Sequence, residues 1–182
     1  MNLTASASNV FSPSDGRVIR LRPIREADLI GLEWEGEYRH FRRLYHEHYE
    51  NSRSGNTLIW VAEDQTSGKI VGQIFILLSS RNRELADGTT RAYLFSFRVR
   101  LEYRSQGLGS FMMAYVEDYL KSLGFRSIRL NVARANLQAY RLYERRGYKK
   151  IGSDPGVWNY QDDQGQWQTV NEPAWKMIKY LR

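Results

Sequence analysis

The spacing of hydrophobic and polar residues changes along the chain, and each spacing predicts a type of secondary structure. Residues 18–22 alternate between apolar and basic side chains, as in a strand with one buried face. Later runs are rich in β-branched and aromatic residues, which favours buried strands: residues 58–62, 70–78, 91–99 and 128–132. The turn residues 64–68 separate two of these runs and predict an antiparallel hairpin.

Two stretches repeat their apolar residues every three or four positions and therefore predict amphipathic helices. The first spans residues 108–123, and Gly124 predicts its end. The second starts near Asn136. A third stretch, residues 29–49, has mixed helical spacing with interrupting glycines, which favours two short helices over one long helix.

A glycine-containing loop joins the strand at 91–99 to the helix at 108–123 and is well suited to bind a phosphate group. A helix that follows such a loop leaves its first N–H groups without intrachain partners, and its dipole adds partial positive charge there. Gly107 and Gly109 lack a Cβ, so a ligand can approach the main chain closely. With the strand at 128–132 the segment forms a βαβ unit, whose two strands we expect to be parallel.

Two common phosphate-binding motifs do not fit this loop. A dinucleotide-binding fingerprint needs a third glycine where Met112 stands. A P-loop needs a Gly-Lys pair followed by Ser or Thr, which the chain lacks. The remaining pattern is Arg-x-x-Gly-x-Gly, formed by Arg104, Gly107 and Gly109.

A second motif follows at residues 136–148 and matches Asn-x-x-Ala-x-x-x-Tyr-x-x-x-Gly-Phe/Tyr. Together, in this order and at this separation, the two motifs resemble the GNAT superfamily of N-acetyltransferases, from about residue 93 to residue 151. The resemblance implies an α/β (α+β) fold, with a central mixed, mostly antiparallel sheet of about seven strands and about four flanking helices. It also implies a parallel pair of strands at the cofactor cleft, a hairpin within residues 158–170 and a closing strand at 173–181.

The resemblance implies that acetyl-CoA is the acyl donor. The family's cofactor contacts fall on Phe97, Arg98, Val99, Arg104, Ser105, Gln106, Gly107, Leu108, Gly109, Ser110 and Asn136. Main-chain N–H groups from Arg104 to Ser110 would hold the pyrophosphate, with added charge from the Arg104 side chain. Pantetheine would run beside residues 97–99 as an extra strand, and an amide there would donate to the thioester carbonyl. Phe97 and Val99 are also suited to the sheet core, and Asn136 is equally suited to capping a helix.

Tyr143 stands at the family's thiolate-facing tyrosine and is the predicted catalytic residue. A phenol with an ordinary pKa near 10 can give a proton to a leaving thiolate. Tyr140 is interpreted as a packing residue. Some family members carry a glutamate base where this chain has Tyr93. Deprotonation of the acceptor amine is therefore left to a water chain or to a carboxylate such as Glu33, Glu35 or Glu37.

In the family, the first two helices usually wall the acceptor site. That role would suit Trp34, Tyr38 and the carboxylates Glu33, Glu35 and Glu37. The 3 histidines lie close to these residues and are interpreted as solvated surface side chains. His46 and His48 face different sides of a helix and make a poor metal pair, so no metal is predicted.

Composition narrows the class of protein. A chain of 182 residues with 42% hydrophobic residues predicts one GNAT domain at 16–182, preceded by a flexible tail at 1–15 that is rich in Ser, Asn and Ala. The chain contains 0 cysteines, which excludes disulfides and fits a reducing cytoplasm. No apolar run matches a membrane span and no signal-peptide pattern is present, so we expect a cytoplasmic protein without a membrane partner.

A net charge of +7 suggests anionic partners. Because the arginines are spread along the chain, this charge favours a polyphosphate cofactor over nucleic acid. The predicted function is an acetyl-CoA-dependent N-acetyltransferase that acts by direct attack of an amine in a ternary complex. The acceptor is a small molecule, a peptide N-terminus or a lysine. The alternatives are an acyl-CoA-binding module without transfer activity and a basic nucleic-acid-binding protein, and a homodimer is common among similar proteins.

Overall fold

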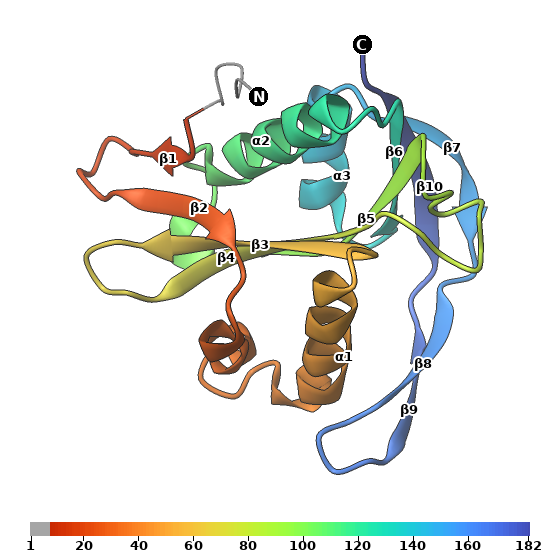
Figure 1. Ribbon diagram of the computed structural model, residues 1–182, viewed down its shortest axis with the longest axis horizontal. Coiled ribbons are helices and arrows are strands. Elements are labelled where there is room, and N and C mark those ends of the chain that lie inside the picture. The colour runs from red at the N-terminus through yellow and green to blue at the C-terminus, as the bar shows by residue number, and fades with distance from the viewer. Residues whose placement is uncertain (1–7) are drawn as a thin grey trace.

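The computed structural model describes residues 8–182, and its main feature is an 8-stranded sheet (Figure 1). The strand order is β1-β2-β3-β4-β5-β6-β10-β7. These strands span Val10–Phe11 (β1), Ile19–Pro23 (β2), Thr57–Asp64 (β3), Ile70–Leu77 (β4), Arg91–Val99 (β5), Ser127–Ala133 (β6), Lys149–Asp154 (β7) and Ala174–Tyr180 (β10). β5 and β6 are parallel and the other neighbours are antiparallel. The predicted mixed, mostly antiparallel sheet with one parallel pair is therefore confirmed.

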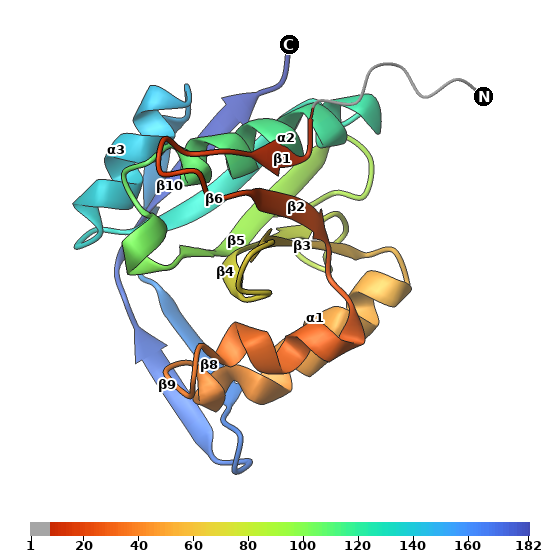
Figure 2. The same ribbon diagram turned by 90° about the vertical axis from the view of Figure 1, so that its left-hand side faces the viewer.

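Helices cover both faces of the sheet (Figures 1 and 2). α2 (Leu108–Ser122) and α3 (Leu137–Arg145) lie on one face. The 3₁₀ helix η1 (Glu26–Glu33) and α1 (Arg42–Arg53) lie on the other, joined through the short η2 (Arg39–Phe41). The prediction of interrupted helices in this segment is confirmed. In the part of the chain that the structure describes, no helix combines the length and the apolar character needed to cross a bilayer.

Each face of the sheet has its own hydrophobic cluster. On the α2 face Leu108, Met112, Val116 and Leu120 are buried at the predicted spacing of three and four residues. On the α1 face Phe75 of β4 is fully buried in a second cluster. Because both faces are covered, the central strands are continuous apolar runs instead of alternating ones.

The strands β5 and β6 separate at the carboxyl end of their parallel pair. Their pairing ends at Leu94 and Leu130, whereas β5 continues to Val99. Near Ser96, whose φ is 47°, the register of β5 against β4 shifts as in a β-bulge. Among residues 8–182, no strand pairs with the β6-facing edge of the last residues of β5. The carboxyl end of β5 therefore has an open main-chain edge.

A second sheet of 2 strands, β8 (Val157–Gln161) and β9 (Trp167–Asn171), extends away from the main sheet beside α1 (Figure 1). Its turn lies at residues 162–165, which confirms the hairpin predicted there. β10 forms where the closing strand is predicted.

The N-terminal segment differs from the expectation of a loose tail up to residue 15. Residues 1–7 lie outside the described part of the chain. Val10 pairs with Arg20, and the ring of Phe11 lies 5.3 Å from the ring of Phe111 on α2. The sequence predicts that ordered structure begins near Arg17, but in the structure it begins earlier, at β1. A strand of 2 residues is too short to show an alternating pattern, so the sequence gives no signal for it.

Candidate active site

The loop between β5 and α2 presents its main-chain N–H groups outward. It follows the 3₁₀ turn η3 (Leu101–Tyr103) and passes through left-handed backbone at Ser105 (φ 60°) and Gly107 (φ 93°). Within residues 8–182, no hydrogen-bond acceptor faces the N–H groups from Ser105 to Ser110. Consecutive free N–H groups at the start of a 15-residue helix form a cradle that fits a phosphate group.

The side chains around this loop hold its shape. The guanidinium of Arg104 donates from Nε to the carbonyl of Val99 at 2.7 Å, so it braces the loop against the end of β5. Arg17 donates to the Oε1 atom of Gln106 at 2.9 Å and lies 4.0 Å from the centre of the Tyr103 ring. Arg17, which no motif indicates, thus also lies beside this loop, where it is ion-paired with Asp15.

The loop and the open edge of β5 meet closely. A Cβ on Gly109 would stand 3.5 Å from the ring of Phe97 and 3.5 Å from the side chain of Leu142 on α3. Phe97 and Val99 also pack in the cluster beneath α2, so their side chains belong to the core while their main chain lies on the open edge. The structure thus brings together the predicted residues of 97–99 and 104–110.

The predicted residues of α3 differ in their surroundings. Tyr143 is buried, with its ring centre 5.8 Å from that of Tyr148. Burial, followed by the neighbouring Tyr93 phenol, raises the pKa of Tyr143 above its ordinary value. Its hydroxyl therefore stays protonated at neutral pH, but the raised pKa also makes it a weaker acid than the ordinary phenol of the sequence-based prediction. Asn136 is exposed and accepts a hydrogen bond from the N–H of Ala139 at 3.0 Å, which makes it the N-cap of α3.

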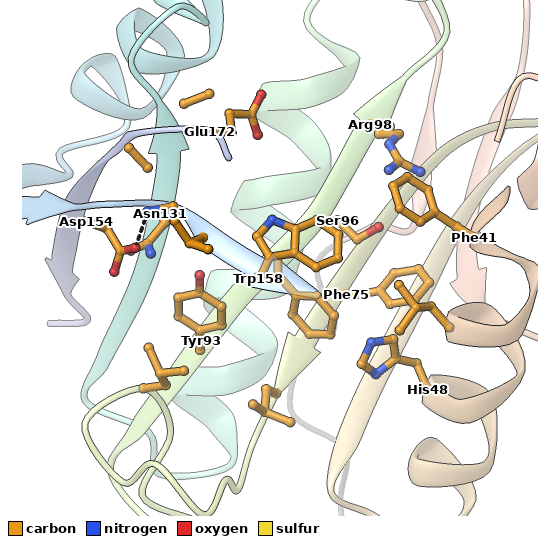
Figure 3. A pocket seen from close by; sticks show the side chains of 18 of the residues that line it. Phe41, His48, Phe75, Tyr93, Ser96, Arg98, Asn131, Asp154, Trp158 and Glu172 are labelled. Carbon is orange, nitrogen blue, oxygen red and sulfur yellow. Dashed lines mark hydrogen bonds between the residues drawn. The ribbon is translucent and has the colours of Figure 1, made fainter. Parts of the chain in front are cut away.

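A cavity of about 550 Å³ opens beside the separation of β5 and β6 (Figure 3). Its walls come from η2 and α1, from β4, β5 and β6, from the end of β7 through the start of β8, from residues 172–174 after β9, and from Leu85 between β4 and β5. The side chains labelled in Figure 3 are Phe41, His48, Phe75, Tyr93, Ser96, Arg98, Asn131, Asp154, Trp158 and Glu172. The cavity lining is mostly apolar, with several aromatic rings and a few polar groups, which is typical of a small-molecule site.

The surroundings of the titratable groups in the cavity shift their pKa values. Burial, followed by the nearby Asp154 carboxylate, raises the pKa of Tyr93 to about 12. The N–H of Gly156 donates to Asp154 at 2.8 Å and holds the pKa of that carboxyl below its usual value. Burial lowers the pKa of His48. At neutral pH the cavity therefore contains a protonated phenol, an ionised carboxylate and a neutral imidazole.

The side chains expected to wall the acceptor site do not line this cavity. Glu33 accepts two hydrogen bonds from Arg42, at 2.5 and 2.7 Å, and is buried at the end of η1. Glu35 accepts from Arg100 at 2.8 Å. Trp34, Tyr38 and Glu37 are likewise absent from the lining. The wall of this cavity instead begins at Phe41 and continues along α1, the second helical segment of the chain.

One histidine and two carboxylates line the cavity although the sequence does not predict them there. His48 is not a solvated surface residue: its ring lies 4.9 Å from that of Phe95, in the wall of the cavity. The cavity carboxylates are Asp154 and Glu172, which no motif indicates. Asp154 ends β7 and Glu172 follows β9, so only the sheet order brings them to β5.

Comparison with known proteins decides the family. Residues 24–148 match the model of the acetyltransferase (GNAT) family, which is more than half of the chain. The chain belongs to the GNAT acetyltransferase family. The predicted fold and the predicted enzyme class, an N-acetyltransferase, are both confirmed.

Sequence relatives of this GNAT protein are distant. The probable N-acetyltransferase camello of Xenopus laevis is 27% identical over 157 residues, which cover 81% of this chain and 67% of the relative. The corresponding Xenopus tropicalis protein is 27% identical over 152 residues, with 79% of this chain and 65% of the relative covered. The chain thus spans about two thirds of the length of these curated relatives.

Solved structures share the GNAT fold. Arabidopsis thaliana NAA60 in complex with acetyl-CoA has a TM-score of 0.67 at 21% identity, with 90% of this chain and 98% of that chain covered. The ribosomal-protein-S18-alanine N-acetyltransferase of Escherichia coli has a TM-score of 0.65 at 18% identity, covering 90% and 94%. Spermidine/spermine N-acetyltransferase SpeG of Vibrio cholerae, in complex with manganese ions, has a TM-score of 0.65 at 18% identity, covering 90% and 92%.

Proposed function

We propose that this GNAT protein transfers the acetyl group of acetyl-CoA to a primary amine by direct attack in a ternary complex. One observation carries the proposal: the open edge of β5 leads at its carboxyl end to the free N–H groups of 105–110, and residues of the same strand line the cavity. A donor on the loop and the strand edge would extend toward the cavity, where an amine can enter. The acetyl-CoA complex of the Arabidopsis structural neighbour supports the choice of donor.

The residues of the chain divide the work of the transfer. The main chain from Arg104 to Ser110 binds the diphosphate, and an amide of residues 97–99 donates to the thioester carbonyl, which stabilises the developing oxyanion. Acetyl-CoA supplies an activated thioester. As the amine nitrogen bonds to the carbonyl carbon and the carbon–sulfur bond breaks, Tyr143 gives its proton to the leaving thiolate. Asn136 stays a proposed pantetheine contact through its exposed side chain.

Deprotonation of the amine falls to solvent. Tyr93 stands where some family members carry a glutamate, and its pKa of about 12 keeps the phenol protonated at neutral pH. Glu33 and Glu35 are held in ion pairs outside the cavity. A water molecule that takes the amine proton can pass it to the open side of the cavity.

The wider setting is part of the same proposal. The zero cysteine count favours a cytoplasmic protein, and the continuous sheet favours one domain, which includes the predicted range 16–182 and also β1 before it. The acceptor is a small molecule or a protein amine, since the named activities of the structural neighbours include both kinds. We propose a homodimer because dimers are common in the family, and we propose no metal and no membrane partner.

Calorimetry and a thiol-release assay test the proposal. Titration with CoA measures donor binding, and incubation with acetyl-CoA and a panel of amines and peptides measures transfer, with mass spectrometry to identify the product. Heat from CoA together with amine-dependent thiol release is expected. CoA binding without transfer to any amine would favour an acyl-CoA-binding module. No CoA binding, together with salt-sensitive binding to DNA or RNA, would favour the nucleic-acid-binding alternative.

A further inference from the structure

A cation without an acidic partner lies in the wall of the cavity. Arg98, on β5, donates from Nη1 to the hydroxyl of Tyr45 at 2.6 Å. Its guanidinium carbon lies 4.0 Å from the centre of the Tyr38 ring and 5.2 Å from that of Phe41. Among residues 8–182, no carboxylate lies within ion-pair distance of Arg98. A phenol and two ring faces therefore surround a full positive charge.

Four other buried or half-buried arginines are neutralised by carboxylates, whereas the half-buried Arg91 and Arg129 donate to main-chain carbonyls away from the lining of this cavity. The four pair as Arg22 with Asp28, Arg42 with Glu33, Arg100 with Glu35 and Arg146 with Glu117. A guanidinium has five N–H donors, and the hydroxyl of Tyr45 occupies one of those of Arg98. A planar fork of free donors beside an apolar cavity is suited to bind a carboxylate with two parallel hydrogen bonds.

The opposite side of the cavity carries negative charge. In Figure 3 Asp154 lies across the cavity from Arg98 with the Trp158 ring between the two, and Glu172 lies above that ring on the side of Asp154. Asp154 has one cation nearby, Lys176, whose Nζ lies 3.4 Å from its Oδ2. In the described part of the chain Glu172 has no cationic partner. The cavity thus has a positive side, a negative side and an aromatic middle.

We infer that the acceptor of the proposed transfer is an amino carboxylate, whose carboxylate binds Arg98 while its amine faces Asp154, Glu172 and Tyr93. This inference rests on the proposed function and names its substrate class. The predicted main-chain contact of Arg98 with pantetheine leaves the side chain free for this role.

Matched pairs of amines test the transfer. Each pair has the same carbon chain with and without a carboxylate: 6-aminohexanoate with pentylamine, and phenylalanine with phenethylamine. At least one pair is expected to show kcat/KM roughly 10- to 100-fold higher for the carboxylate, the range of a charge-assisted hydrogen-bond pair. The Arg98→Met variant is expected to lose this preference, and Arg98→Lys to retain part of it. Equal rates within every pair, or an unchanged preference in Arg98→Met, would overturn the inference.

A binding measurement separates this inference from the proposed function. The N-acetyl carboxylates are titrated by calorimetry in the presence of CoA, with the corresponding N-acetyl amines as the comparison, so no turnover is needed. Selective binding of the carboxylates that Arg98→Met abolishes would support the anion site even if no amine were acetylated. The control is Arg39→Met, because Arg39 pairs with Asp163 and does not line the cavity. The CoA titration of each variant shows whether it is folded.

Discussion

The donor side and the acceptor side of the proposed site are built in different ways. The donor side is mostly main chain from one βα unit, residues 97–110, and its shape depends on two left-handed residues, Ser105 and Gly107. The acceptor cavity is lined by side chains from α1 through the segment after β9, far apart in sequence. A contiguous main-chain site can be encoded by a short motif, whereas a site of scattered side chains can vary without changing the fold. This difference explains how one fold can serve many acceptors.

The largest expected effect tests whether the two sides meet at Tyr143. The Tyr143→Phe variant keeps the ring but removes the proton donor, so kcat should fall by roughly 100-fold or more, as for loss of a general acid. CoA affinity, measured by calorimetry, should change little. Tyr140→Phe on the same helix is the matched control, since Tyr140 only packs at the edge of the core. Unchanged turnover in Tyr143→Phe would mean that the thiolate leaves without this phenol.

The second largest effect is expected from a substitution that distorts the acceptor cavity and leaves the donor side intact. Gly156 has a φ of 68°, and a Cβ there would stand 1.8 Å from the carbonyl oxygen of Glu172. Gly156→Ala should therefore displace the β7–β8 connection and lower the free energy of unfolding by about 3 kcal/mol. We expect a raised acceptor KM with an unchanged Kd for CoA, measured by steady-state kinetics and calorimetry.

Gly68→Ala is the control for Gly156→Ala. Gly68 has a nearly equal φ of 69° but nothing within 4 Å of its Cβ position, so it reports the backbone strain alone. Its expected cost is about 1 kcal/mol, seen in urea unfolding, with no change in acceptor KM. If both variants behaved alike, the contact with Glu172 would not shape the cavity.

The donor side could be predicted from the sequence because it is contiguous, whereas the scattered side chains of the acceptor cavity could not. The glycine loop and the 136–148 motif predict the parallel pair and the donor side, because a local motif fixes a local backbone. Nothing local indicates that Asp154 and Glu172 reach the cavity, since sheet order alone brings them there. Glu33 and Glu35 are wrongly expected at the acceptor site because their partners, Arg42 and Arg100, are unknown before the chain folds.

The third effect is confined to the donor side. Gly107 has a φ of 93°, where an alanine is strained by about 1–2 kcal/mol. Gly107→Ala should relax the loop and turn its N–H groups away from the phosphate, which weakens CoA binding roughly 5- to 30-fold by calorimetry. The acceptor KM should stay the same. Gly124→Ala, at a φ of 91° with open space around its Cβ position, is the control and should leave CoA affinity intact.

The smallest effect concerns pH and the acceptor side. Burial lowers the pKa of His48 below its ordinary 6.5, and the nearby Glu47 opposes this shift only in part. The unfolded chain therefore binds a proton at His48 more readily than the folded protein does. The stabilisation from a neutral His48 is complete above pH 6.5 and is lost as the pH falls below that value. The slope cannot exceed about 1.4 kcal/mol per pH unit, the value for one proton.

Urea unfolding between about pH 5 and pH 7.5 measures this slope, because the unfolding free energy changes by 2.303RT per proton and pH unit. The His48→Gln variant should have a shallower slope than the unaltered protein. His46→Gln, at an exposed position of the same helix, should keep the original slope. Equal slopes in the two variants would assign the acid sensitivity to groups outside the cavity wall. A shallower slope confined to His48→Gln would assign this part of the acid sensitivity to the wall of the cavity.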